Sequence, residues 1–342
     1  MKRLIGLAAL AAISAASTAA LAQAPPAPVL AKGLDSAGRP LPFGRAPRLA
    51  PETPLGSGKF KAVMATDDSL PAHVLYYPAN LKAAGKLPVV AFGNGACINA
   101  GNRFRSFLTE IASHGYLVSA NGVMANPELE VGPQENPRVR QPGEPPPAPP
   151  PPRDPNAPQR APGTTTPSQL TESIDWATKA NADPKSRFYR RIDTTKVAVM
   201  GQSCGGVQAL NVAGDPRITT LMIWSSGVGM IPNNPPDAQK VLGSVHTPIA
   251  FIHGDQVHDV AYPASVANTQ SLTNVPVFEG WQDGMTHIGT YGAKDGGFFG
   301  KIAVDWLDWR LKGDAKATKM FKGRDCMLCN SPSWHITKKA ID

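Results

Sequence analysis

The feature that most constrains the fold of this chain is an alternation of continuous apolar runs with segments of helical periodicity. Such runs are typical of strands buried on both faces, and their alternation with helices predicts an α/β fold with a mostly parallel central sheet and helices on both of its faces. The runs are LPVVAFGN (87–94), YLVSANG (116–122), KVAVM (196–200), ITTLMIWSS (218–226), TPIAFIHG (247–254) and VPVFEGW (275–281). An earlier pair of strands is predicted at 61–67 and 72–78.

Four segments between and after these strands carry the pattern of helices. In the first of them, Phe107, Leu108 and Ile111 fall on one helix face. In the last, apolar and aromatic residues alternate with charged ones as on an amphipathic surface. The predicted helices are 102–115, 168–181, about 205–213 and 301–313.

The first 22 residues have the features of a secretory signal peptide. They start with Lys2 and Arg3, continue with an apolar run at 4–16, and end on the small-x-small sequence ALA at 20–22. This run is too short to span a bilayer, and the sequence has no other segment apolar enough for a membrane helix. We therefore expect an exported protein of a bacterial periplasm or exterior, without a transmembrane segment.

Two proline-rich segments accompany the predicted domain, which we place at 59–342. Residues 23–58 are rich in Pro, Ala and Gly and predict a loosely docked leader. The insertion at about 132–163 holds seven prolines within 145–152, a run that cannot donate a hydrogen-bond ladder and predicts polyproline II. The sequence leaves open whether this insertion covers a cleft or is an exposed spacer.

The charge of the chain excludes one class of partner. The net charge is +8, and two of these charges belong to the predicted signal peptide. The other basic residues are scattered or lie in the insertion and near the C-terminus, whereas a nucleic-acid-binding face concentrates them among aromatic residues. We therefore expect no nucleic-acid partner and a monomer whose basic surface favours anionic envelopes.

Residues 196–210 (KVAVMGQSCGGVQAL) contain the candidate catalytic motif. In it, Gly201, Ser203 and Gly205 follow a predicted strand and precede a predicted helix. At such a strand-to-helix corner a serine takes strained backbone angles and is lifted into the open, and glycine two positions to either side leaves room for the crossing chain. The context predicts Ser203 as a nucleophile; the alternative is a tight turn rich in small residues.

A nucleophilic serine needs a base and an orienting carboxylate. In this architecture they follow in the order acid and then histidine, each in a loop after a later strand. The loop after 247–254 holds Asp255 and Asp259, and the loop after 275–281 holds His287. We assign Asp259 as the acid, because Asp255 lies at the strand end, where a carboxylate more often caps the turn.

The tetrahedral intermediate of acyl transfer also needs two backbone donors. One is the amide of Cys204, directly after the predicted nucleophile. The other is predicted within PVVAFGNGAC (88–97), which lines up with the apolar strand, His-Gly and donor of many hydrolases. Asn94 takes the place of the histidine, and this makes Ala96 the second donor.

Five motifs of the chain resemble those of α/β-hydrolases of the dienelactone-hydrolase and cutinase-like (polyester hydrolase) branch. They are PVVAFGNGAC, EIASHGYLV, GQSCGG, DVAYP and THIGTY, spread over about 60–315. The resemblance implies an α/β-hydrolase fold in which Ser203 is the nucleophile, His287 the base and Asp259 the acid. It also implies that the amides of Ala96 and Cys204 form the oxyanion hole.

The chain departs from this family's pattern at two places. Dienelactone hydrolases carry a cysteine at the elbow position that Ser203 holds here, and Cys204 cannot replace it because Gln202 would then occupy the required glycine site. The aromatic clamp of polyester hydrolases has no secure match. Trp224 and Trp281, near strand ends, are candidates both for substrate contact and for packing.

Together these features predict an exported serine esterase that cleaves a small or polymeric carboxylic ester through an acyl-enzyme, with no cofactor and no metal. Two alternatives remain open. The same triad can act on amides or in acyl transfer, or the chain can be a non-catalytic binding protein on a hydrolase scaffold. The second is disfavoured because serine, acid, histidine and glycines are all present in order.

Four cysteines in an exported chain favour two disulfides. Cys97 follows one predicted oxyanion donor and Cys204 is the other, so convergence of the two amides brings these cysteines within bridging distance. Cys326 and Cys329 are near enough to pair with each other. We predict these two bridges; the alternatives are free buried thiols at the first pair and a metal site that adds His335 to the second.

Overall fold

A computed structural model describes residues 53–132, 164–230 and 237–342 of the chain. All of them belong to one compact unit, 32–342. The predicted signal peptide, most of the predicted leader and nearly all of the proline-rich insertion lie outside the described residues. Within the described ranges, no helix combines the length and the hydropathy needed to cross a membrane.

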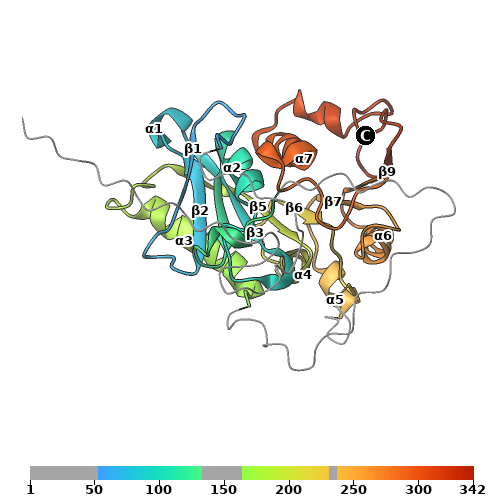
Figure 1. The fold of residues 1–342 in the computed structure, drawn as a ribbon, viewed down its shortest axis with the longest axis horizontal. Helices are drawn as coiled ribbons and strands as arrows, with labels where there is room; N and C mark the ends of the chain where they lie inside the picture. Colours follow the sequence, from blue (N-terminus) through green and yellow to red (C-terminus); the bar gives the residue numbers. More distant parts are fainter. Residues whose placement is uncertain (1–52, 133–163, 231–236) are drawn as a thin grey trace, which may run out of the picture. The chain divides into compact units, whose positions relative to one another are not determined.

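Figure 1 shows strands of the described residues side by side between helices. They build one nine-stranded sheet with the order β1-β2-β4-β3-β5-β6-β7-β8-β9. The neighbours from β4 through β8 are all parallel, and only β1, β2 and β9 pair antiparallel. The predicted α/β class with a mostly parallel sheet is confirmed. The strands are β1 (Ala62–Ala65), β2 (His73–Pro78), β3 (Leu87–Gly93), β4 (Leu117–Asn121), β5 (Ile192–Gln202), β6 (Thr220–Trp224), β7 (Ile249–Gly254), β8 (Val277–Gln282) and β9 (Trp334–Lys339).

Helices cover both faces of the sheet. Along β3, Val90 and Phe92 pack in the cluster that contains α2 and α7, whereas Val89 and Ala91 pack in the cluster that contains α3 and α4. Because side chains alternate between the faces of a strand, one continuous apolar run supplies both cores. The helices are α1 (Leu81–Ala84), α2 (Arg105–Ser113), α3 (Pro167–Ala182), α4 (Cys204–Asn211), α5 (Ala238–Gly243), α6 (Tyr262–Ser271) and α7 (Gly297–Leu307).

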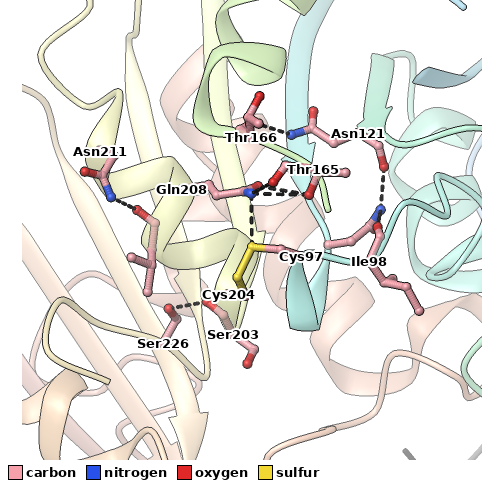
Figure 2. The surroundings of a disulfide bond; sticks show 12 residues. Cys97, Ile98, Asn121, Thr165, Thr166, Ser203, Cys204, Gln208, Asn211 and Ser226 are labelled. Carbon is pink, nitrogen blue, oxygen red and sulfur yellow. Dashed lines mark hydrogen bonds between the residues drawn. A yellow bond between two sulfur atoms is a disulfide. The ribbon is translucent and has the colours of Figure 1, made fainter. Parts of the chain in front are cut away.

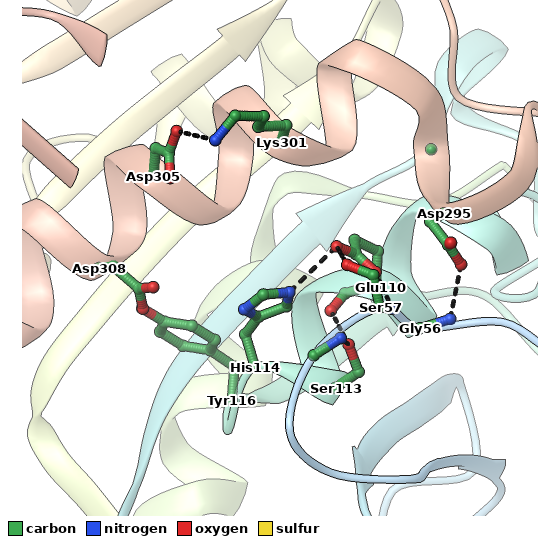
Figure 3. A network of polar contacts seen from close by, with 12 residues as sticks. Gly56, Ser57, Glu110, Ser113, His114, Tyr116, Asp295, Lys301, Asp305 and Asp308 are labelled. Atoms are coloured by element: carbon green, nitrogen blue, oxygen red, sulfur yellow. Dashed lines mark hydrogen bonds and ion pairs between the residues drawn. The ribbon is translucent and has the colours of Figure 1, made fainter. Parts of the chain in front are cut away.

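A polar network at the end of α2 fixes the chain before β1 (Figure 3). The buried Glu110 carboxylate accepts hydrogen bonds of 2.6 Å from both the amide and the hydroxyl of Ser57, and His114 Nε2 lies 3.0 Å from the same carboxylate. Burial favours a higher pKa for Glu110, but these partners outweigh it and lower the pKa. The end of the predicted leader is therefore part of the folded domain, which begins before residue 59.

The C-terminal segment is also part of the domain. β9 pairs with β8, and Cys326, Leu328 and Trp334 are buried in the cluster that contains α7. No strand is predicted in this segment from the sequence, so β9 is an addition to the predicted sheet. In β9 only Trp334 and Ile336 alternate with polar residues, and a signal this short does not separate a strand from a loop.

Candidate active site

The turn between β5 and α4 holds Ser203 in a strained conformation. The strand ends at Gln202 and the helix begins at Cys204, so Ser203 is the single residue between them, with φ 55° and ψ −122°. The Ser203 amide donates to the carbonyl of Trp224 at 2.9 Å, and the Ser203 carbonyl accepts from the Ser226 hydroxyl at 2.6 Å. Strain of this kind persists only where the surroundings over-determine it.

Glycines on either side of Ser203 make this turn sterically feasible. A Cβ at Gly201 would collide with the carbonyl oxygen of Gly205, and a Cβ at Gly205 would collide with the carbonyl oxygen of Gly93. Both obstacles are backbone atoms, which cannot swing aside as a flexible side chain can. The two glycines that flank the serine are therefore required by the close approach of β3, β5 and α4.

The structure brings Ser203, Asp259 and His287 into one hydrogen-bonded chain. His287 Nε2 lies 2.8 Å from Ser203 Oγ, and His287 Nδ1 lies 2.8 Å from Asp259 Oδ1. The carboxylate only accepts, so Nδ1 donates to it, and Nε2 is left to accept from the serine hydroxyl. Ser203 is 8% exposed at the carboxyl edge of the sheet, whereas Asp259 is only 2% exposed.

The surroundings of Asp259 keep its buried carboxylate ionised. Burial favours a higher pKa, but the hydrogen bond and charge of His287 act against it, together with the amides of Gly254 and Ala261, each 2.8 Å from a carboxylate oxygen. The net effect lowers the pKa of Asp259 below its ordinary value. The carboxylate can therefore stabilise an imidazolium at His287.

Asp255, the other carboxylate in the same loop, has a different environment. Its Oδ1 accepts from the amides of Val257 at 2.9 Å and His258 at 2.8 Å, and its Oδ2 accepts from the amide of Gly284 at 2.6 Å. It therefore caps the turn after β7, as predicted for a carboxylate at the strand end. It also ties this turn to the loop that carries His287.

The loop after β3 carries Ala96, the second predicted amide donor. Ala96 and Cys97 have φ values of 55° and 48°, in the sparsely populated left-handed region. The Asn94 side chain supports this loop by donating to the carbonyls of Ala100 and Asn121. Among the backbone hydrogen bonds that join turns, loops and caps of the described residues, none is donated by the amide of Ala96 or Cys204.

A disulfide joins this loop to the start of α4 (Figure 2). The predicted bridge between Cys97 and Cys204 is confirmed, with 5.2 Å between the α-carbons. Around it, Gln208 Nε2 lies 3.0 Å from the Cys97 sulfur and donates to the carbonyl of Thr165 at 2.6 Å. The Thr165 amide in turn donates to the carbonyl of Cys97 at 2.9 Å. One candidate oxyanion amide belongs to Cys204 and the other to Ala96, the neighbour of Cys97. The bridge therefore restrains these two amides relative to each other.

The second predicted bridge, between Cys326 and Cys329, is also confirmed. Because these two sulfurs are bonded to each other, they are not thiolate ligands for a metal. His335, the third ligand of the alternative metal site, stacks on the ring of Trp281. Within the described residues, no group of three or more His, Cys, Asp or Glu side chains is arranged to hold a metal ion.

The two tryptophans that were candidates for substrate contact, Trp224 and Trp281, differ in their burial. Trp224 is fully buried and packs against Phe107, Tyr291 and Phe299. Of the two alternatives left open for it, packing is therefore confirmed and substrate contact is wrong. Strand alternation directs it into the same core as α2 and α7. Trp281 is partly buried, and its ring stacks on the ring of His335 with centroids 3.8 Å apart. For Trp281, substrate contact and packing both stay open.

Sequence reasoning missed residues that join the loops of the site. Gln202 Nε2 donates to the carbonyl of His287 at 2.9 Å across 85 residues of sequence. The amide of His287 donates a hydrogen bond to the carbonyl of His258 at 3.2 Å. Neither contact belongs to a local motif, so no signal within the sequence alone points to it.

Comparisons with known proteins assign the chain to no family. No model of a known protein family matches the chain, and a search of curated proteins finds no match. The functional argument therefore depends on the arrangement of Ser203, His287, Asp259 and the two amides around them.

Proposed function

We propose that this protein is an exported serine hydrolase of the α/β-hydrolase fold that cleaves carboxylic esters through an acyl-enzyme. The observation that carries the proposal is the chain of two 2.8 Å contacts from Asp259 through His287 to Ser203. A strained serine between a strand and a helix supports it, as does the order of serine, acid and histidine along a mostly parallel sheet.

In the proposed first half-reaction, Ser203 Oγ bonds to the ester carbonyl carbon while its proton passes to His287 Nε2. The carbonyl oxygen becomes an oxyanion, which accepts hydrogen bonds from the amides of Ala96 and Cys204. Collapse of this intermediate breaks the bond to the alcohol oxygen, which takes the proton from His287. Asp259 keeps the imidazole in the tautomer that this transfer needs.

In the second half-reaction, water attacks the acyl group on Ser203 and gives one proton to His287 Nε2. The tetrahedral intermediate then expels the Ser203 oxygen, which recovers that proton, and the carboxylic acid is released. One ester and one water thus give one acid and one alcohol, without a cofactor or a metal.

Two features bear on where the enzyme acts and on what substrate. Both disulfides fit an oxidising compartment, which supports export to a periplasm or to the exterior. The burial of Trp224 removes one of two aromatic candidates for a polymer-binding surface. A polymeric ester therefore stays a proposal that depends on Trp281.

The experiment is a panel of p-nitrophenyl and aryl esters of increasing acyl length, assayed with the mature protein and with Ser203→Ala. We expect turnover by the mature protein and a loss of about a thousandfold or more in the variant, with its fold intact. Added amine acceptors test acyl transfer, because aminolysis faster than hydrolysis would favour that alternative. Near-native hydrolysis by Ser203→Ala would contradict the proposal.

A further inference from the structure

Gln202, the residue before the predicted nucleophile, contacts two other loops of the site. Its Nε2 donates to the carbonyl of His287 at 2.9 Å, and its side chain is buried. Its carboxamide also packs on Gly95, the neighbour of the predicted donor Ala96: a Cβ at Gly95 would collide with Gln202 Oε1. One side chain therefore spans the nucleophile turn, the histidine loop and the loop after β3.

The backbone of His287 is held at both of its polar atoms. The amide donates to the carbonyl of His258 at 3.2 Å, which joins the histidine loop to the loop of the acid. The carbonyl accepts from Gln202, which joins the same loop to the nucleophile turn. Because these two bonds hold the peptide units before and after the His287 α-carbon, they fix the point from which the imidazole reaches Ser203.

Gly95 and Gln202 are complementary in shape. The three atoms nearest to a Cβ at Gly95 all belong to Gln202: Oε1, then Cδ at 3.2 Å and the backbone oxygen at 3.7 Å. Without the Gln202 carboxamide, no atom would lie closer than 3.7 Å to the Cβ of an alanine at 95, which is an ordinary van der Waals distance. The carboxamide of Gln202 is thus the reason that residue 95 has no room for a side chain.

We propose that Gln202 is a positioning residue, which places His287 and the Ala96 loop relative to Ser203. The inference rests on the proposed function, because its consequence is a rate. A displaced imidazole and a displaced donor impair the reacting geometry more than they impair substrate binding, so kcat falls and KM changes little. Gln202 itself touches neither the ester nor a proton in transfer.

The first test replaces Gln202 by methionine, which has a similar length and no N–H donor. For Gln202→Met we expect kcat to fall about 10- to 100-fold with KM within about threefold. The matched control is Gln282→Met, because Gln282 ends β8 as Gln202 ends β5 and donates to Ser333 at 3.4 Å. The control is expected to keep native kcat. A native kcat in Gln202→Met would overturn the inference.

The second test is a double-mutant cycle of Gly95→Ala and Gln202→Ala, read out in kcat and in melting temperature. Gly95→Ala alone should lower both, because its Cβ displaces the carboxamide. In the Gln202→Ala background the same change should cost much less, since the obstacle is gone. Additive losses in an active wild-type protein would overturn the inference alone. A wild-type protein without esterase activity would overturn the proposed function, and a non-additive melting-temperature cycle would then leave Gln202 as a packing contact only.

Discussion

The two halves of the candidate site are held by different forces. The disulfide half, residues 94–98 and 201–208, is fixed by the Cys97–Cys204 bridge and by direct backbone contacts at Gly201 and Gly205. The histidine half, residues 254–262 and 284–291, contains no cysteine, and hydrogen bonds to two carboxylates organise it. A covalent cross-link thus stabilises the half that contains Ser203 and the candidate amide donors, but not the half that contains His287 and Asp259.

This difference agrees with the two tasks in the proposed mechanism. Amide donors stabilise an oxyanion best when they are fixed in advance, because no reorganisation is then needed as charge develops. The His287 imidazole takes a proton from one oxygen and delivers it to another, and hydrogen bonds allow the small ring movement that this requires. We therefore expect substitutions in the disulfide half and in the histidine half to differ in how strongly they lower kcat and the free energy of unfolding.

The largest effect is expected when the histidine half loses its buried acid. Asp259→Asn should lower kcat about 10⁴-fold, because an amide facing Nδ1 favours the wrong tautomer of His287. The matched control is Asp255→Asn, four residues earlier in the same loop, which should keep kcat within about tenfold. Steady-state ester hydrolysis by both variants decides between them. A larger loss in Asp255→Asn would reverse the assignment of the acid.

The next effect concerns the disulfide half. Removal of the Cys97–Cys204 bridge by two alanine substitutions opens a loop of 107 residues, which corresponds to about 5 kcal/mol of unfolding free energy on chain entropy. Loosened donors should also lower kcat about tenfold or more in the molecules that remain folded. Urea unfolding and turnover at low temperature measure the two losses separately.

The Cys326–Cys329 bridge is the matched control for that experiment. It closes a loop of only three residues, for which the same relation gives about 1.6 kcal/mol. Its removal should leave kcat unchanged. If both double variants lose turnover equally, the bridge beside Ser203 has no special role in fixing the donors.

A smaller effect, on stability, is expected for Asp255→Asn. Burial favours a higher pKa for Asp255, but the amides of Gly284 and His258 and the His258 ring lower it. A carboxylate with a lowered folded-state pKa stabilises the fold above its unfolded pKa of about 3.9, and this stabilisation is lost as pH falls through the folded pKa. The variant should lose about 1–3 kcal/mol at pH 7.

The pH dependence provides the check on that prediction. The difference in unfolding free energy between wild type and Asp255→Asn should narrow as pH falls below about 4, where the wild-type carboxylate takes up its proton. Urea titrations at pH 7, 5 and 3.5 measure it. A difference that stays constant over this range would show that the charge of Asp255 is not what stabilises the turn.

The smallest effect on turnover is expected from the proline-rich insertion, because the described residues at its borders contact both halves. Gly132 packs directly against Gly292 near the histidine half, and the Thr165 amide donates to the carbonyl of Cys97. Replacement of 133–163 by a short Gly-Ser linker should leave the domain folded, since such a run adds no sheet hydrogen bonds. Turnover of a small ester should change by less than about threefold. A shortened protein that is not a soluble monomer would contradict this.

The fold could be predicted where its signals are local. β3 and α3 lie within one residue of their predicted bounds, because a continuous apolar run and a 3.6-residue period each report directly on burial. β5 is longer than predicted, since its first residues, 192–196, are mostly polar and only partly buried. β9 was missed because its pairing with β8 depends on residues more than fifty positions away.

The candidate site shows the same division. The elbow of Ser203 could be predicted because its glycines lie two positions away on either side. The cysteine pairing followed from the predicted convergence of two amides. The role of Trp224 stayed open between packing and substrate contact because the end of a strand does not reveal which face a side chain takes. Gln202 was missed because its partner is 85 residues distant.

The most direct test of the central claim is labelling with a fluorophosphonate, followed by intact-mass measurement and peptide mapping of the mature protein. The serine oxygen displaces fluoride and forms a bond to phosphorus, a reaction that requires an activated nucleophile. We predict one adduct per chain, on the peptide that contains Ser203, with none in Ser203→Ala and slow labelling in Asp259→Asn. An unlabelled wild-type protein, or an adduct on any other residue, would contradict the account.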